Sequence, residues 1–202
     1  EVVQDLSYIW YWISATNTWN CFRLSQYACS SVRKAADEWD IPDTVTTIWN
    51  EFMCAQFFSC KYLIETPKEW KMWTGVTSIG DDYRSYMFQD CDSLTNWAIE
   101  QELQNVSTIW GSYRAWQYYN CPELTVIYDE RLWDNVTTIW QRFRAWQYFQ
   151  CLKLTMAAKE TLPNSLLSIW SHFRYYQYQQ SSSLAIPAEE VMPDSVTTIW
   201  NY

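Results

Sequence analysis

The sequence predicts an α/β solenoid, with parallel strands on one side and short helices on the other. Two observations lead to this prediction. A marker of the type Thr-Thr-Ile-Trp returns about every 30 residues, and each return brings the same downstream residue types. A period of roughly 20–50 residues is typical of repeat architectures, in which each unit buries its apolar surface against its neighbours. The chain has 202 residues, which is ample for such a core.

The marker divides the chain into repeats. Its complete copies occupy residues 46–49, 77–80, 107–110, 137–140, 167–170 and 197–200, and a degenerate first copy ends at Thr18 and Trp19. The spacing is 30 residues, with one step of 31. The expected organisation is a partial N-terminal repeat over 1–17, a six-repeat solenoid over 18–198 and a truncated C-terminal repeat over 199–202.

The residues after the marker predict a short helix. In one repeat the recurring types are Trp140, Phe143, Arg144, Gln147, Tyr148 and Cys151. At 100° per residue they fall within an arc of about 140°, and changing positions such as Gln141 and Trp146 fill the other side. We therefore expect about three helical turns, with Thr138 as the N-cap. An all-helical repeat is the competing fold.

The rest of each repeat predicts extended chain. Residues 124–128 read Leu-Thr-Val-Ile-Tyr, which are strand-forming types, and Leu63, Leu94 and Leu154 begin the matching segments. Turn chemistry of the Pro-Asp-Ser type follows at residues 41–45, 162–166 and 192–196. One repeat is thus predicted to be strand, turn, short extended piece and helix.

Two polar rows accompany the aromatic ones. Arg144 and Gln147 lie on the recurring face and need partners there. We expect the glutamine amides to hydrogen bond from repeat to repeat and the guanidinium groups to stack on neighbouring rings. The alternative for arginine is an extended side chain whose charge reaches water at the helix edge.

The cysteines form a further row. Cys60, Cys91, Cys121 and Cys151 follow one another at intervals of 31, 30 and 30 residues, and the total of seven cysteines is odd. This favours buried free thiols, with disulfides or metal ligation as the alternatives. His172 is the only histidine, which excludes a multi-histidine metal site.

No catalytic set is visible. The chain has no GxSxG, P-loop or GxGxxG motif, and it has only three glycines from which to build one. The cluster of Asp81, Asp82, Asp90 and Asp92 is interpreted as solvated surface in preference to a metal site. An acid/base pair would need convergent residues, whereas Asp129 and Glu130 are adjacent. We predict no enzyme activity, no catalytic residue, no cofactor and no metal.

One family resemblance emerges from these motifs. The string Pro-Asp-Ser-Val-Thr-Thr-Ile at 193–199 and the Phe-x-x-Cys-x-x-Leu-Thr segment at 88–95 resemble the BspA-like class of leucine-rich repeats. The resemblance implies a curved leucine-rich-repeat-like solenoid with a parallel sheet. Members are usually surface or adhesion proteins that bind other macromolecules, which implies a cell-surface or extracellular location, although no signal peptide is visible in this chain.

The chain departs from the family pattern in every repeat. About four more residues separate the Ile from the Cys, and about three more separate the Cys from the next Pro-Asp-Ser. The glycine that the family has after the Ile survives only at Gly80. Duplication of an expanded unit and deliberate engineering both fit these identical expansions. Either origin predicts a wider solenoid filled with aromatic side chains.

The function predicted is that of a non-enzymatic repeat scaffold that binds protein or serves as structure. Its uncapped ends could also self-associate. Candidate contact positions are the outward residues of the extended segments: Thr95, Trp97, Thr125, Ile127, Asp129, Thr155, Ala157 and Lys159. Ordinary solvated positions are the alternative for them. The net charge of −9 argues against nucleic acid, and no apolar run is long enough to span a membrane.

A carbohydrate-binding module is the second functional hypothesis. It would use exposed aromatic rows, with the tryptophans outside the recurring positions stacking on sugar faces. These are Trp39, Trp70, Trp73, Trp97 and Trp133. The competing interpretation is that they fill the core of a widened solenoid.

Overall fold

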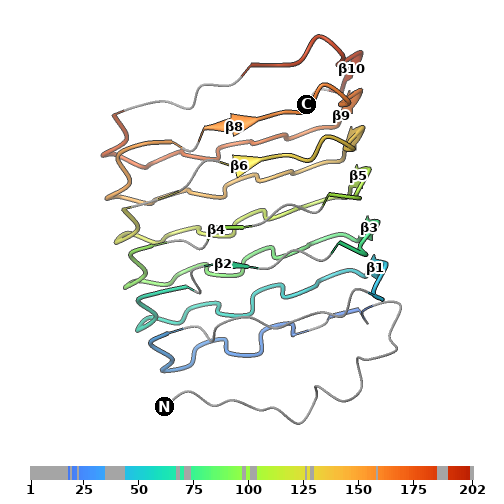
Figure 1. Ribbon diagram of the computed structural model, residues 1–202. Coiled ribbons are helices and arrows are strands. Elements are labelled where there is room, and N and C mark those ends of the chain that lie inside the picture. Colours follow the sequence, from blue (N-terminus) through green and yellow to red (C-terminus); the bar gives the residue numbers. More distant parts are fainter. Residues whose placement is uncertain are drawn as a thin grey trace.

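The chain winds into successive coils that stack on one another from the N-terminal to the C-terminal side (Figure 1). The computed structural model describes residues 18, 20–21, 23–34, 44–66, 69–70, 74–96, 99–100, 104–125, 127, 130–157, 159–185 and 191–200. The partial repeat expected over 1–17 lies outside these residues. Each coil is one sequence repeat, so the predicted repeat organisation is visible as stacked layers.

The described strands are short and all their pairings are parallel. The Thr-Ile of the marker forms β1 Thr47–Ile48, β3 Ser78–Ile79, β5 Thr108–Ile109, β7 Thr138–Ile139, β9 Ser168–Ile169 and β10 Thr198–Ile199. A second set lies elsewhere on the coil, with β2 Glu69–Trp70, β4 Ile99–Glu100, β6 Glu130–Arg131 and β8 Glu160–Thr161. Each set runs up its own side of the stack (Figure 1).

The strand register follows the sequence period. Ile48 is opposite Ile79, Ile109 opposite Ile139, and Ile139 opposite Ile169. Ile48, Ile79, Ile109 and Ile139 are fully buried. Since a side chain in a strand faces opposite to its neighbours, an isoleucine in this register points into the core in β1, β3, β5, β7 and β9, whereas Ile199 of β10 is 56% exposed. The parallel solenoid-like arrangement predicted from the repeat is confirmed.

The predicted helices are wrong, because no described residue is helical. The segment after the marker, residues 141–150, is a run of consecutive turns, called here the turn run; the matching segments of other coils share the name. Every second residue in much of it has positive φ: Arg142 (59°), Arg144 (50°) and Trp146 (53°). An α-helix needs the same right-handed φ and ψ at every residue, so this alternation excludes it.

Backbone hydrogen bonds explain why the turn run is stable without a helix. The N–H of Arg144 donates to the Tyr113 carbonyl of the preceding coil at 2.9 Å, and that of Trp146 donates to the Tyr175 carbonyl of the following coil at 2.8 Å. Intervening residues donate three residues back, as Ala145 does to Arg142 at 3.2 Å. Bonding between coils therefore replaces the ladder of an α-helix.

Two further local predictions need correction. Thr138 is not an N-cap: it lies in β7, and its N–H donates to the Ser107 carbonyl at 3.4 Å. Of the strand predicted over 124–128, the described residues 124, 125 and 127 are not in a strand, and the strand of this part of the coil is found at Glu130–Arg131. The first residues of the predicted segment are nevertheless bonded to the neighbouring coil, since the Thr125 N–H donates to the Thr95 carbonyl at 3.2 Å.

The core consists of aromatic rows that run from coil to coil. One row stacks Phe52, Tyr83, Tyr113, Phe143 and Phe173, and a second stacks Tyr27, Phe57, Phe88, Tyr118, Tyr148 and Tyr178. Ring centroids within these rows are 5.2–5.6 Å apart. The helical arc thus correctly identified five of its six residues as buried, although the backbone that buries them is not helical; Trp140 is only half-buried, and Ala145, assigned to the other side, is fully buried.

Candidate functional site

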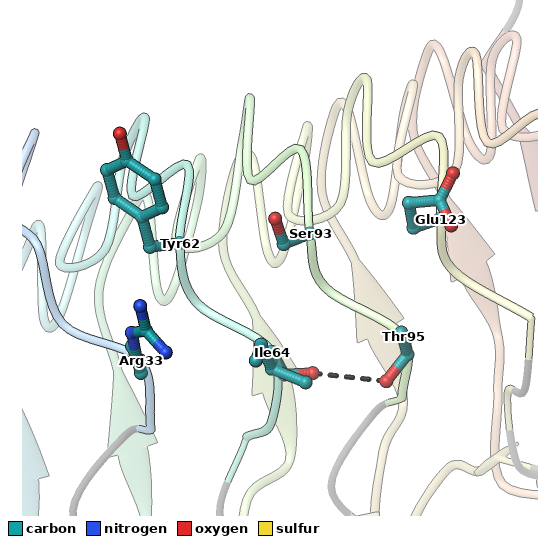
Figure 2. Close-up of a pocket in the computed structure, with 6 residues that line it drawn as sticks. All are labelled: Arg33, Tyr62, Ile64, Ser93, Thr95 and Glu123. Atoms are coloured by element: carbon teal, nitrogen blue, oxygen red, sulfur yellow. Dashed lines mark hydrogen bonds between the residues drawn. The ribbon is translucent and has the colours of Figure 1, made fainter.

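A groove on the outer surface is the candidate site. It has a volume of about 500 Å³ and is lined by Arg33, Tyr62, Ile64, Ser93, Thr95 and Glu123. Figure 2 shows these residues on successive coils, so the groove crosses the stack. Arg33, Ile64 and Thr95 lie opposite one another in successive coils, since the Ile64 N–H donates to the Arg33 carbonyl at 2.9 Å and the Thr95 N–H donates to the Ile64 carbonyl at 3.1 Å. Tyr62, Ser93 and Glu123 are each the second residue after a cysteine of the row.

A turn after the cysteine row positions the groove residues. The Leu63 N–H donates to the Cys60 carbonyl at 3.0 Å, and the Leu94 N–H donates to the Cys91 carbonyl at 3.2 Å. Each leucine is fully buried. Because the leucine points inward, the residue after it, such as Thr95, points outward. In each coil the Cys-x-x-Leu spacing therefore places two side chains along the groove. In the coil of Cys91 these are Ser93, on the turn before the leucine, and Thr95, directly after the leucine.

The groove floor is held by bonds between coils. The Thr95 N–H and hydroxyl both donate to the Ile64 carbonyl, at 3.1 and 3.2 Å. The Thr125 hydroxyl likewise donates to the Thr95 carbonyl at 3.1 Å. Both hydroxyl protons are used in this way. Each threonine oxygen presents lone pairs to solvent, so the row offers a ligand acceptors more readily than donors.

Charge and apolar surface are distributed unevenly along the groove. Arg33 and Glu123 lie at opposite ends of the set in Figure 2. Between them Tyr62 is 61% exposed and Ile64 is 41% exposed. Glu123 is paired with Lys153 at 2.6 Å. The arrangement suits a ligand that has an acidic group, an apolar part and an extended shape.

The predicted contact positions fall partly on this surface. Thr95 lines the groove, and Thr125 and Thr155 are exposed in the same row. Lys159 is exposed, whereas Ile127 and Ala157 are half-buried. Trp97 and Asp129 lie outside the described residues. Among the described members of this set, Thr95 alone lines the groove.

The sequence interpretation missed the remaining groove residues. The second residue after each cysteine is Tyr62, Ser93, Glu123 and Lys153 in successive coils. Variation at one position of an otherwise regular repeat is the signal that could have identified it. Variable positions on a fixed scaffold are where repeat proteins place binding residues.

The polar rows inside the stack hold partners as expected. Arg84, Arg114 and Arg144 are buried, and their guanidinium carbons lie 5.2, 5.3 and 4.9 Å from the ring centroids of Tyr83, Tyr113 and Phe143. That range is within the reach of cation–π attraction. The interpretation of a charge at the helix edge is wrong for these three residues.

The glutamine row is continuous over three coils. Gln147 donates to Gln117 at 3.1 Å, and Gln177 donates to Gln147 at 3.0 Å. All three side chains are buried. A carboxamide carries a donor and an acceptor, so each residue can serve both neighbours in the stack. The prediction of amide bonding from repeat to repeat is confirmed here.

The charge states of the buried groups follow from burial. Burial lowers the pKa of the Arg114 guanidinium, and the neighbouring Arg144 and Arg84 lower it further. Burial also raises the pKa of the Cys151 thiol from 9.0 to about 12. A thiol with a raised pKa stays protonated at neutral pH, where a nucleophile would need to be a thiolate. The Cys151 thiol instead donates to the Tyr118 carbonyl at 3.2 Å.

The cysteines and aspartates have structural roles. All seven cysteines are free, and those of the row are buried. Asp81 accepts a hydrogen bond from the Gly111 N–H at 2.7 Å, Asp90 accepts one from Asn120 at 2.8 Å, and Asp92 is 3.7 Å from Lys61. Among the described residues, no group of three or more His, Cys, Asp or Glu could hold a metal ion.

The tryptophans divide into two kinds. Trp133, proposed for sugar binding, is 4% exposed and lies edge-on to Tyr113 at 6.1 Å, so it fills the core. Trp39, Trp73 and Trp97 lie outside the described residues, as does the side chain of Trp70. The row that reaches the surface is instead the last residue of the marker, called here the Trp ladder, in which Trp110 and Trp200 are exposed and the two between them are half-buried: Trp110, Trp140, Trp170 and Trp200.

Comparison with family models, with curated proteins and with solved structures gives no significant match. None of the residues described by the structure belongs to a helix long and apolar enough to cross a membrane.

Proposed function

We propose that this chain is a non-enzymatic repeat scaffold that binds an extended segment of a protein in the groove. The observation that carries the proposal is the continuity of the groove across coils, from Arg33 past Tyr62 and Thr95 to Glu123. A rigid stack with exposed, variable side chains on one side is how solenoids recognise other macromolecules. The resemblance to BspA-like repeats supports the same class of function and remains part of the proposal.

The dimensions of the groove suit a short peptide. Arg33 and Glu123 lie three coils apart, and parallel neighbours are about 4.8 Å apart, which gives a span of about 14 Å. An extended chain rises about 3.3 Å per residue, so about four residues cover the span. The acidic end of such a segment would meet Arg33, and an apolar side chain would pack on Tyr62.

Selection from a random linear peptide library, followed by affinity measurements, tests the proposal. Thr95→Arg fills the groove and should lower the affinity of selected peptides about tenfold or more, equal to about 1.4 kcal/mol. Thr155→Arg is the matched control, because Thr155 is exposed in the same row but does not line the groove. It should change the affinity by less than about twofold.

Two outcomes would contradict the proposal. If both arginine variants weakened the peptides equally, binding would not depend on the groove. If no peptide were enriched while a glycan array gave binding, the carbohydrate hypothesis would take its place. Tyr62, at 61% exposed, is the groove residue that could stack on a sugar, and Tyr62→Ala would then abolish the glycan signal.

A further inference from the structure

The Trp ladder contains a gap at Gly80. Its indole rings stack face to face, with centroids 5.2 Å apart for Trp110 and Trp140, 4.4 Å for Trp140 and Trp170, and 5.1 Å for Trp170 and Trp200. The interplanar angles are 9°, 10° and 15°. Trp49 and Gly80 hold the two preceding places, so one ring of the series is missing.

The register places the gap inside the stack. The Gly80 N–H donates to the Ile48 carbonyl at 2.8 Å, as the Trp140 N–H does to Ile109 and the Trp170 N–H does to Ile139. On its other side the Gly80 coil is bonded to the coil of Trp110, since Asp82 N–H donates to the Gly111 carbonyl at 3.0 Å. Gly80 therefore stands directly between the coils that carry Trp49 and Trp110.

The missing ring leaves aromatic surface open. Trp110 is 41% exposed and Trp49 is 48% exposed, whereas Trp140 and Trp170, each with a ring on both sides, are half-buried. Trp140 covers one face of Trp110. On the other side Gly80 holds the matching place of the adjacent coil, and a glycine offers no ring to stack there. Two coil steps of about 4.8 Å separate the coils of Trp49 and Trp110. At the pitch of the ladder, that distance accommodates one additional ring.

This protein cannot fill the gap with a side chain at position 80. A Cβ added to Gly80 would collide with the Asn50 side chain and lie 2.7 Å from its backbone nitrogen. Asn50 is fixed there, because its Oδ1 accepts a hydrogen bond from the Asp81 N–H at 3.0 Å. A ring that enters from solvent needs no attachment to the backbone, so the restriction does not apply to a ligand.

A carboxylate lies beside the gap. Asp81 follows Gly80, and its Oδ1 accepts the Gly111 N–H at 2.7 Å, so it bridges the same two coils. Glu51 follows Asn50 and Asp82 follows Asp81, and the three carboxylates interact electrostatically. Together with the net charge of −9, they make the electrostatic potential near the gap more negative. A cation over an aromatic face is further stabilised by attraction to the ring.

We propose that the gap at Gly80 binds a flat, cationic aromatic group, which stacks on the open face of Trp110 beside Asp81. The site shares no residue with the groove. It predicts one bound molecule per gap and a preference for planar cations over planar anions of the same size.

Titration with proflavine, a flat cationic dye, tests the site by calorimetry and by the induced circular dichroism of the dye. Trp110→Ala removes the stacking surface and should weaken binding about tenfold or more. Trp200→Ala is the matched control: it removes another exposed tryptophan of the ladder, far from the gap, and should change the affinity less than about twofold. Far-ultraviolet circular dichroism and melting curves verify that both variants are folded.

A second variant separates charge from stacking. Asp81→Asn keeps an oxygen that accepts the Gly111 N–H and removes the negative charge, so it should weaken proflavine binding about threefold. A sulfonated anthracene should bind the unaltered protein at least about tenfold more weakly than proflavine. Equal weakening by Trp110→Ala and Trp200→Ala, or equal affinity for the anionic and cationic probes, would overturn the proposal.

Discussion

Two consecutive coils carry nearly the same side chains but bury them differently. In the coil of residues 140–151, Phe143 and Tyr148 are fully buried and Arg144 is 2% exposed. In the next coil, 170–181, their counterparts Phe173, Arg174 and Tyr178 are half-buried. The first coil has described neighbours on both sides of its turn run, whereas the second has a described neighbour on one side. Burial in this fold is therefore set by neighbouring coils more than by residue type.

The contrast explains what stabilises the protein. Each turn run donates its N–H groups both forward and backward along the stack, and its rings stack in both directions. A coil gains the full interaction only when both neighbours are in place. This is the behaviour of quasi-one-dimensional repeat proteins, in which stability is the sum of repeat and interface terms.

The largest expected effect comes from removing a ring that stacks on both sides. Phe143→Ala should lower the free energy of unfolding by about 3–5 kcal/mol, because it deletes a fully buried phenyl group and leaves a cavity. Phe173→Ala should cost about half as much, since that ring is only half-buried. Urea unfolding of both variants measures the difference. Equal losses would mean that neighbouring coils do not determine burial energy.

Alkaline pH should distinguish the two coils through Cys151 and its counterpart Ser181. The pKa of Cys151 is about 12 in the folded protein against 9.0 for an exposed thiol. The neutral buried thiol therefore contributes to the free energy of unfolding in full below pH 9.0, and this contribution is lost as the pH rises toward 12. Between pH 9.0 and 12 the free energy of unfolding of Cys151→Ser should therefore fall by about 3–4 kcal/mol less than that of the unaltered protein, because serine does not ionise in this range.

The hydrogen bond should survive this substitution. Ser181 already donates to the Tyr148 carbonyl at 2.8 Å, in the way that Cys151 donates to Tyr118. Unfolding measured by urea at pH values between neutrality and 12 gives the profile, and Cys29→Ser, at an exposed position, is the control. An identical pH profile for Cys151→Ser and the unaltered protein would exclude a buried thiol at this position.

The arginine row gives an intermediate effect. Arg144→Ala should lower the melting temperature at constant fold, with a loss of about 2 kcal/mol from the stacking contact with Phe143 and from packing. Arg144→Met should cost less, because methionine fills the space without a buried charge, and Met53 already occupies this place in another coil. Thermal melts of both variants measure the two losses of stability. An unchanged melting curve for the alanine variant would reject a stacked arginine row.

The smallest effect concerns backbone handedness. Arg142 is exposed and has a φ of 59°, so Arg142→Gly should relieve left-handed strain and raise stability by up to about 1 kcal/mol. Gln141→Gly is the matched control at an exposed neighbour without positive φ and should lower stability by about 0.5–1 kcal/mol. Chemical unfolding compares the pair. Equal destabilisation by both glycines would contradict the alternating backbone.

The period and the buried rows could be predicted from sequence because they depend on side-chain type. Ile139, Phe143 and Gln147 recur in nearly every repeat, and all three are buried. The sequence could not exclude the predicted helix, because glycine or asparagine is usually the sign of a residue with positive φ. Here residues such as Arg144 and Trp146 adopt it, and bonding to adjacent coils, which a single repeat does not display, holds them there.

The groove was only partly predictable for a related reason. Thr95 was identified as an outward residue of an extended segment, which local alternation is sufficient to predict. Arg33, Tyr62 and Glu123 come from three different coils and become neighbours only when the coils are stacked in register. The resulting gradient from cation to anion is a property of the assembled surface.

The bonding of each coil to its neighbours has a mechanical consequence. A force that peels the chain from one end loads the bonds of a single coil, whereas a shearing force between distant coils loads many at once. Peeling should therefore proceed in discrete steps, each releasing one repeat of about 30 residues, or about 100 Å of contour length. Resistance should depend strongly on the direction in which the molecule is pulled.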